Sequence, residues 1–252
     1  MTFLNSGSTR QGTQAQGYAW DPLRPDILDL LRKSRHISVE PIYFGSNHCF
    51  LVTLESSTSG ESLAVYKPAR GEYPLYDFPQ GSLYKREIAS WQINDLLGWN
   101  VIPATVASNG RFGPGSLQVF IESQEAGDID VGELQRLALL DVLLNNADRK
   151  PEHCMLGDDA KLWGIDHGLT FHVQPKMRTI LWHFAGESIP HDMYADVERV
   201  LCCLQNENAA QRRNLRTLVT GAEMQAFVRR LTLVANSGRF PDPRHKAVPY
   251  RW

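Results

Sequence analysis

The sequence has no apolar stretch near the roughly 20 residues that a membrane-spanning helix needs. Its start, "MTFLNSGSTRQGTQAQG", is polar and rich in Gly, Ser and Gln, and it lacks the charged and then apolar layout of a signal peptide. We therefore expect a cytoplasmic protein without integral membrane association, with a flexible segment over residues 1–18.

Cysteine is scarce, and its four positions are Cys49, Cys154, Cys202 and Cys203. None lies in a Cys-x-x-Cys spacing, so we expect neither a zinc site nor a redox motif. The apolar settings of three of them are typical of plain core residues. Charge is balanced at a net −2, so no basic excess predicts a nucleic-acid partner and no acidic run predicts a disordered tail.

The length of 252 residues favours one two-lobed domain. With 42% hydrophobic residues, the chain can bury a sizeable core without disulfide or metal staples. The composition therefore predicts an ordinary globular protein and leaves its function to the motifs.

The first half of the chain has mainly the patterns of strands. A helix over 26–34 precedes them, and a longer helix over 82–99 ends near Gly98. Apolar, β-branched runs predict the strands 38–45, 48–55, 62–68, 101–108 and 116–123. The first two strands flank the turn Gly45, Ser46 and Asn47, and an aromatic loop over 71–81 precedes the long helix.

The second half has the apolar spacing of helices, over 131–144, 195–205 and 220–238. Thr220 and Glu223 match a capping box at the start of the last one. Residues 239–252 carry three prolines and are expected to wrap a surface. The pattern predicts an α+β fold with a smaller sheet lobe over 19–123 and a helical lobe over 124–252.

Four charged residues occupy informative positions along this pattern. Lys67 ends a strand, and Glu87 lies on the long helix after it. Asp148 opens the loop after a buried helix, and Asp166 lies at the end of an apolar strand. Each alone has an ordinary explanation as a surface residue, a helix cap or a turn. Their joint order is the order that phosphoryl transfer from ATP requires.

In such a site a lysine neutralises the phosphates and a glutamate from a neighbouring helix fixes that lysine. One aspartate orients the attacking hydroxyl, and a second holds the metal that bridges the phosphates. The backbone N–H groups of Gly45, Ser46 and Asn47 could cover the phosphates, although one glycine in this turn is a weak signal by itself.

The same residues resemble a known family. "DRKPEH" resembles the "DLKPEN" catalytic loop of protein kinases, and "NNADR" and "GIDHGLTFH" resemble signatures of phosphatidylinositol 3-/4-kinases and of HipA-like kinases. The chain is most similar to bacterial phosphatidylinositol 3- and 4-kinase-related proteins, from about Gly45 to Gly186. The resemblance implies a two-lobed protein-kinase-like fold and ATP with Mg²⁺ or Mn²⁺ as cofactors.

The resemblance also implies roles for single residues. Lys67 corresponds to the phosphate-binding lysine, Glu87 to its helix partner, Asp148 to the catalytic aspartate and Asp166 to the metal aspartate. Further implied positions are Lys150 at the transferred phosphate and Phe120 and Ile121 near the adenine.

His153 departs from the family pattern, which has asparagine five residues past the catalytic aspartate. Magnesium prefers oxygen ligands over imidazole. His153 could bind manganese or contact phosphate as a donor, or catalysis could be weak. Lys176 and Arg178 could receive an anionic substrate or form a solvated loop.

The sequence therefore predicts an ATP-dependent phosphotransferase acting on a hydroxyl of an unidentified protein, lipid or small molecule. Two alternatives stay open. One is a nucleotide-binding pseudokinase that serves as a scaffold, and the other is a nucleotidyl transferase that attaches AMP with the same fold.

Overall fold

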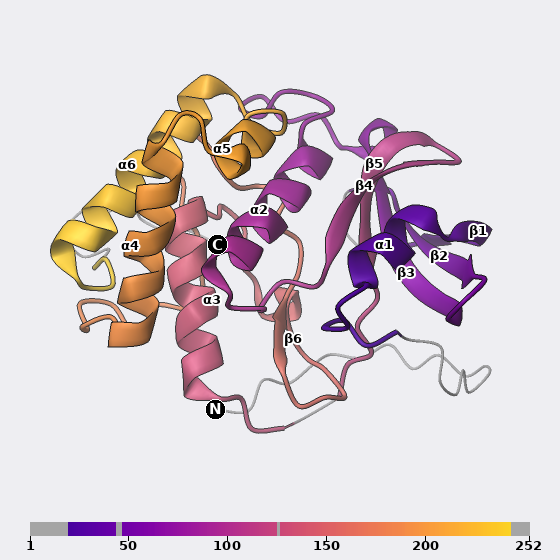
Figure 1. Ribbon diagram of the computed structural model, residues 1–252, viewed down its shortest axis with the longest axis horizontal. Coiled ribbons are helices and arrows are strands. Elements are labelled where there is room, and N and C mark those ends of the chain that lie inside the picture. The colour runs from indigo at the N-terminus through magenta and orange to yellow at the C-terminus, as the bar shows by residue number, and fades with distance from the viewer. Residues whose placement is uncertain (1–19, 44–46, 125–126, 243–252) are drawn as a thin grey trace.

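The computed structural model describes residues 20–43, 47–124 and 127–242. In Figure 1 a twisted sheet lies on one side of the molecule and a group of helices on the other, with α2 between them. The predicted segment 1–18, the turn residues Gly45 and Ser46, and residues 243–252 of the predicted C-terminal wrap lie outside the described residues.

The sheet has five strands in the order β1-β2-β3-β5-β4, and all neighbours are antiparallel. Their bounds are β1 Arg35–Ile42, β2 Cys49–Ser56, β3 Gly60–Pro68, β4 Thr105–Gly110 and β5 Gly113–Val119. Because strands β3 and β5 pair with Lys67 opposite Ser116, Lys67 lies near the middle of the sheet. The α+β fold class predicted from the sequence is confirmed by the sheet and the helices that follow it.

The β4–β5 hairpin differs from the prediction of strands over 101–108 and 116–123. Gly110 pairs with Gly113, so only two residues form the turn between the strands. Glycines allow this tight return, since Gly113 has φ +95°, a conformation that other residues rarely adopt. Strand β5 ends earlier than predicted because the chain leaves the sheet after Val119 and pairs with the end of the later strand Cys154–Leu156, where the Gln124 N–H bonds the Leu156 carbonyl over 2.8 Å.

Helix α1 (Ile27–Lys33) packs against the sheet and completes its core. Three apolar residues of α1 are buried there, at the spacing of one helix face. They are Ile27, Leu30 and Leu31. They join buried strand residues in one cluster, which includes Val52, Leu54, Ala64, Tyr66, Val106, Leu117 and Val119.

Helix α2 (Leu83–Leu97) contacts β4 and β5 on one side and α4 on the other. It is therefore not a surface helix with one apolar face, since its polar residues are buried as well. The buried polar residues are Arg86, Glu87, Ser90 and Asn94. Gly98 ends the helix with φ +74°, as the sequence predicted.

The remaining helices form the second core. They are α3 (Val131–Leu144), α4 (His191–Gln205), α5 (Ala210–Leu215) and α6 (Gly221–Ser237), and α6 packs on both α3 and α4. Thr220 and Glu223 form the predicted capping box. Helix α4 begins four residues before the predicted start, and α5 was not predicted. No helix among the described residues is long and apolar enough to cross a bilayer.

Short elements complete the region between α3 and α4. The strands β6 (Cys154–Leu156) and β7 (Leu162–Gly164) form a two-stranded antiparallel sheet, which the sequence analysis did not predict. Two short 3-10 helices are also present. The first, η1 (Ala69–Gly71), follows β3, and the second, η2 (Pro151–His153), precedes β6. Strand β7 leads directly into Asp166.

The prediction of core cysteines is wrong in its simple form. Cys202 is exposed, and Cys49, Cys154 and Cys203 are only half-buried. On α4 the buried face is formed by Met193, Val197, Val200 and Leu204. At the spacing of a helix, Cys202 lies opposite this face and Cys203 lies at its edge.

Candidate active site

Lys67 lies at the end of β3, where successive side chains point to opposite faces of the sheet. Its neighbour Tyr66 is fully buried in the sheet core, so Lys67 points to the side of α2. Its Nζ lies 2.5 Å from Glu87 Oε1 and 3.0 Å from Asp166 Oδ1. The structure thus brings together three residues that the sequence separates by up to 99 positions.

The opposite charges of Lys67 and Asp166 stabilise each other, whereas burial raises the pKa of Glu87. Burial by itself lowers the pKa of Lys67, but the carboxylates of Asp166 and Glu87 outweigh burial and raise the pKa above its ordinary value. The charge of Lys67 is the largest cause that lowers the pKa of Asp166. Lysine and aspartate are therefore both ionised at neutral pH. The side chain of Asp166 is 43% exposed, whereas that of Glu87 is 4% exposed, so Asp166 is the carboxylate open to a ligand.

Asp148 lies in the loop that follows α3. The helix ends at Asn145, whose φ of +55° turns the chain sharply. The Asp148 N–H then bonds Asn146 Oδ1 over 3.0 Å, and Lys150 Nζ lies 2.9 Å from Asp148 Oδ2. The side chain of Asp148 is 32% exposed. This loop holds the aspartate and the lysine side by side at the surface of the site.

His153 lies at the end of this loop and faces Asp166. Its Nδ1 lies 2.9 Å from the backbone carbonyl of Asp148, and because a carbonyl only accepts, Nδ1 donates. Burial is the main cause that lowers the pKa of His153, so its ring is neutral at pH 7. Nε2 then carries the lone pair of the ring, and this atom lies 3.4 Å from Asp166 Oδ2. Two lone pairs that face each other favour a cation near them.

Asp148, His153 and Asp166 could together hold a metal ion. Each offers one ligand atom, and these atoms lie within 4.8 Å of one another. The donor set of two carboxylates and one neutral imidazole suits Mn²⁺ and accepts Mg²⁺ less readily. The residues present therefore fit a divalent cation. Asp166 itself has φ +58°, a strained conformation for a residue other than glycine, which is common at functional sites.

Arg149 is a residue of the site to which the sequence analysis assigned no role. Its side chain is fully buried, and its five N–H groups all have acceptors. Nε and Nη2 bond both oxygens of Asp141 over 3.0 Å. Nη1 bonds the carbonyls of His153 and Ile165, each over 2.9 Å, and Nη2 also contacts His167 Nε2 over 2.7 Å. One guanidinium thus fastens the loop of Asp148 to the segment of Asp166.

Asp141 and His167 complete this buried network. Asp141 Oδ1 accepts from Asn146 Nδ2 over 2.8 Å, which fixes the start of the loop. The His167 N–H donates to Glu87 Oε2 over 2.9 Å, so the partner of Lys67 is held from both sides. A signal for this network is present in "LALLDVLL", because a carboxylate inside an apolar helical run needs a buried cation. The sequence does not show which cation that is.

The loop over 71–81 packs beside the end of the first turn through its backbone. The Tyr73 N–H donates to Asn47 Oδ1 over 2.7 Å, and the His48 N–H donates to the Gly71 carbonyl over 2.9 Å. Farther along, Asp77 forms an ion pair with Lys176. Lys176 is therefore neither a free solvated lysine nor an open receptor for an anion.

Phe120 and Ile121 begin the connection from the sheet to the helical part. The Phe120 N–H donates to the Leu63 carbonyl over 3.1 Å, next to β3. Ile121 is 6% exposed and packs with the core of the sheet. Phe120 is half-buried, so of the two it offers more accessible surface to a bound base.

Comparison with known proteins shows the family of the chain. No protein-family model matches the chain. Protein Rv2133c from Mycobacterium tuberculosis (strain ATCC 25618 / H37Rv) is 33% identical over 271 residues, which cover 90% of this chain and 96% of the relative. The chain belongs to the family of Rv2133c.

Solved structures show which fold the Rv2133c family has. Hydra Fam20 with sugar has a TM-score of 0.54 and 15% identity, over 87% of this chain and 89% of that one. The Golgi casein kinase with Mn/ADP bound has a TM-score of 0.57 and 14% identity, over 86% and 79%. A second structure of the Golgi casein kinase has a TM-score of 0.56 and 14% identity, over 90% and 80%. The chain therefore has an α+β kinase-like fold.

Proposed function

We propose that the protein is an ATP-dependent phosphotransferase, with residues 19–123 as the nucleotide-binding lobe and 124–252 as the lobe that carries the catalytic loop. The observation that carries the proposal is the meeting of Lys67, Glu87 and Asp166 within ion-pair distance, although they come from β3, α2 and the segment after β7. The kinase-like fold and the sequence resemblance to phosphatidylinositol 3-/4-kinase-related proteins support it.

The nucleotide is bound mainly by charge. Lys67, held by Glu87, neutralises the phosphates of ATP. Phe120 and Ile121 lie near the adenine. The turn that is proposed to cover the phosphates ends at Asn47, and its residues Gly45 and Ser46 lie outside the described part of the chain. Glu87 also accepts a hydrogen bond from the backbone N–H of His167, the residue after Asp166. Its carboxylate therefore positions both Lys67 and the segment of Asp166.

The acceptor side of the site depends on the loop after α3. Asp148 orients the acceptor hydroxyl and receives its proton, and Lys150 steadies the transferred phosphate. Asp166 and His153 hold Mg²⁺ or Mn²⁺, and the metal supplies neutralisation of phosphate charge when it is bound. The acceptor is a hydroxyl of a protein, a lipid or a small molecule.

Nucleotide binding is the first test. ATP with Mn²⁺ should raise the unfolding temperature of the wild type, and Asp166→Asn should remove the metal-dependent part of that rise. Glu87→Gln should weaken ATP binding about tenfold, since Lys67 then keeps a single carboxylate partner. Asp158→Asn is the matched control, because Asp158 is exposed and its side chain has no ion pair among the described residues. A wild type without any metal-dependent rise would refute the ATP site.

Phosphate transfer is the second test. Label from γ-labelled ATP should move to an acceptor in extracts, and Asp148→Asn should abolish this transfer while ATP binding is kept. Transfer from α-labelled ATP alone would instead identify a nucleotidyl transferase. ATP binding without transfer of either label would identify a binding protein, and transfer that survives in Asp148→Asn would remove this residue from the catalytic role.

A further inference from the structure

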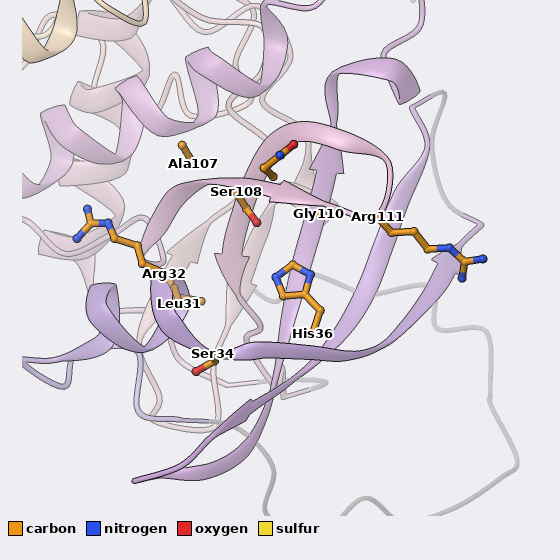
Figure 2. A pocket seen from close by; sticks show the side chains of 9 residues that line it. Leu31, Arg32, Ser34, His36, Ala107, Ser108, Gly110 and Arg111 are labelled. Carbon is orange, nitrogen blue, oxygen red and sulfur yellow. The ribbon is translucent and has the colours of Figure 1, made fainter.

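A cavity of about 400 Å³ lies in the sheet part of the molecule and shares no residue with the candidate active site. It lies where α1, the start of β1 and the β4–β5 turn come together (Figure 2). Its lining is Leu31, Arg32, Ser34, His36, Ala107, Ser108, Asn109, Gly110 and Arg111. The volume is within the range of small-molecule sites, roughly 300–1,000 Å³.

The charge of the cavity is positive. Two arginines and one histidine are among the nine lining residues, and none of the nine is acidic. The neighbouring cations Lys33 and Arg35 form ion pairs with carboxylates outside the lining. Arg32 and Arg111, in contrast, have no ion pair with any described residue. Both are exposed, and Figure 2 shows them at opposite sides of the cavity with their guanidinium groups directed outward. Either long side chain can rotate toward the cavity and pair with an anionic ligand there.

The rest of the lining is polar. Ser34, Ser108 and Asn109 offer hydroxyl and amide groups, and only Leu31 and Ala107 are apolar. Figure 2 shows His36 and Ser108 from different strands facing the same space. In addition, β4 is an edge strand of the sheet, so one side of its backbone has no partner strand among the described residues. Such a wall favours a ligand with many hydrogen-bonding groups.

We propose that this cavity binds a small polyhydroxylated molecule that carries a phosphate group, of the class of sugar phosphates. Arg32 or Arg111 pairs with the phosphate, and Ser34, Ser108 and Asn109 bond the hydroxyl groups.

The cavity is also linked to the candidate active site through Tyr66. The rings of His36 and Tyr66 have centroids 6.4 Å apart, edge to face. Gly110 lies so close to the Tyr66 ring that an added Cβ would come within 2.9 Å of its Cζ, and the Tyr66 hydroxyl donates to the Gly113 carbonyl. Tyr66 directly precedes Lys67 on β3. A ligand that orders this wall therefore orders β3 near Lys67 and tightens nucleotide binding, a step that rests on the proposed function.

The binding site is tested on the full chain without nucleotide, with glucose 6-phosphate, glucose and inorganic phosphate as probes. Calorimetry and amide chemical shifts should show saturable binding of glucose 6-phosphate at residues 31–36 and 107–111, with glucose at least about tenfold weaker. Arg32→Gln and Arg111→Gln should each lower the affinity for glucose 6-phosphate. The loss should be about tenfold for the arginine that pairs with the phosphate. Arg229→Gln, on the exposed side of α6, should leave its affinity unchanged.

Three results would overturn the site. They are equal affinity for glucose and glucose 6-phosphate, equal weakening by Arg229→Gln, and no saturable shift at the lining amides with any probe up to roughly 10 mM. The link is tested separately, by titrating ATP with and without glucose 6-phosphate. Unchanged ATP affinity refutes the link through Tyr66 and leaves the site standing. Absence of ATP binding refutes the proposed function instead. The titration with glucose 6-phosphate in the absence of nucleotide still shows whether the cavity binds its ligand.

Discussion

The substitution Arg149→Lys tests whether the buried guanidinium holds the candidate site together. Arg149 donates five N–H groups, to Asp141, His167 and the carbonyls of His153 and Ile165. Burial by itself lowers the pKa of Arg149, but Asp141 outweighs burial and raises it, so the guanidinium is charged in the folded protein. Lysine keeps this charge and loses the planar geometry.

The magnitude follows from counting donors. A lysine ammonium has three N–H groups, so at least two of the five hydrogen bonds are lost. Hydrogen bonds that involve a charged group contribute about 1.5–3 kcal/mol each, and two of them correspond to a loss of at least about 3 kcal/mol of unfolding free energy. For a chain of this length the loss lowers the unfolding temperature by roughly 6–12 °C. The retained charge keeps Asp141 paired and avoids a larger loss.

Thermal and urea unfolding of wild type and variant measure this loss. Arg35→Lys is the matched control, because Arg35 also pairs with a carboxylate, Glu55, but its side chain is 70% exposed. The control should unfold like the wild type, since exposed ion pairs contribute little. If Arg149→Lys unfolds at the same temperature as Arg35→Lys, then the network around Arg149 does not hold the loop, and the reasoning is wrong.

Two further predictions concern the metal site and the packing of α2. Because burial lowers the pKa of His153, Mn²⁺ affinity should be constant above about pH 6.5 and decrease as pH falls through the lowered pKa and the ring gains a proton; calorimetry across pH measures this. Glu223→Gln removes the counter-charge of the buried Arg86 and should lower the free energy of urea unfolding by roughly 3–5 kcal/mol.

Matched variants separate these effects from general ones. His183→Asn changes an exposed histidine and should leave Mn²⁺ affinity and its pH dependence intact, whereas His153→Asn should flatten the decrease. A pH profile that is the same in His153→Asn and wild type would contradict the assignment of His153. For the ion pair, Glu207→Gln is the control, since Glu207 is 79% exposed in its pair with Arg212. Equal losses in Glu223→Gln and Glu207→Gln would contradict the role of burial.

Local patterns were sufficient to predict most of the fold. The sheet, the long helix and the capping box of α6 depend on periodicity and on capping residues near in sequence, so their existence was predictable. Strand ends were less so, because the β4–β5 pairing is decided by the neighbouring strand: Gly115 lies against the backbone of Lys67, where an added Cβ would come within 2.5 Å of its carbonyl oxygen. That contact joins residues far apart in the chain.

In the candidate site, too, some features could be predicted from the sequence and others depend on contacts between distant residues. The order of Lys67, Glu87, Asp148 and Asp166 could be recognised because phosphoryl transfer requires these residue types. Most contacts of Arg149 could not, since three of its four acceptor residues lie 8 residues before it and 16 and 18 residues after it, on separate elements. A charged residue in a polar loop looks solvated in the sequence, and only the packing of α3 against the segment after β7 shows that it is buried.

The ion pair of Arg86 and Glu223 has a consequence for the order of events during synthesis. Arg86 precedes Glu87 on α2, and its partner belongs to the capping box that begins α6, 137 residues later. While a ribosome still holds the C-terminal part of the chain, Arg86 on α2 lacks the carboxylate that pairs with it in the complete fold. The nascent protein therefore positions Glu87 beside Lys67 only after α6 has emerged, and a chain truncated before Thr220 is expected neither to bind nucleotide nor to compete for it.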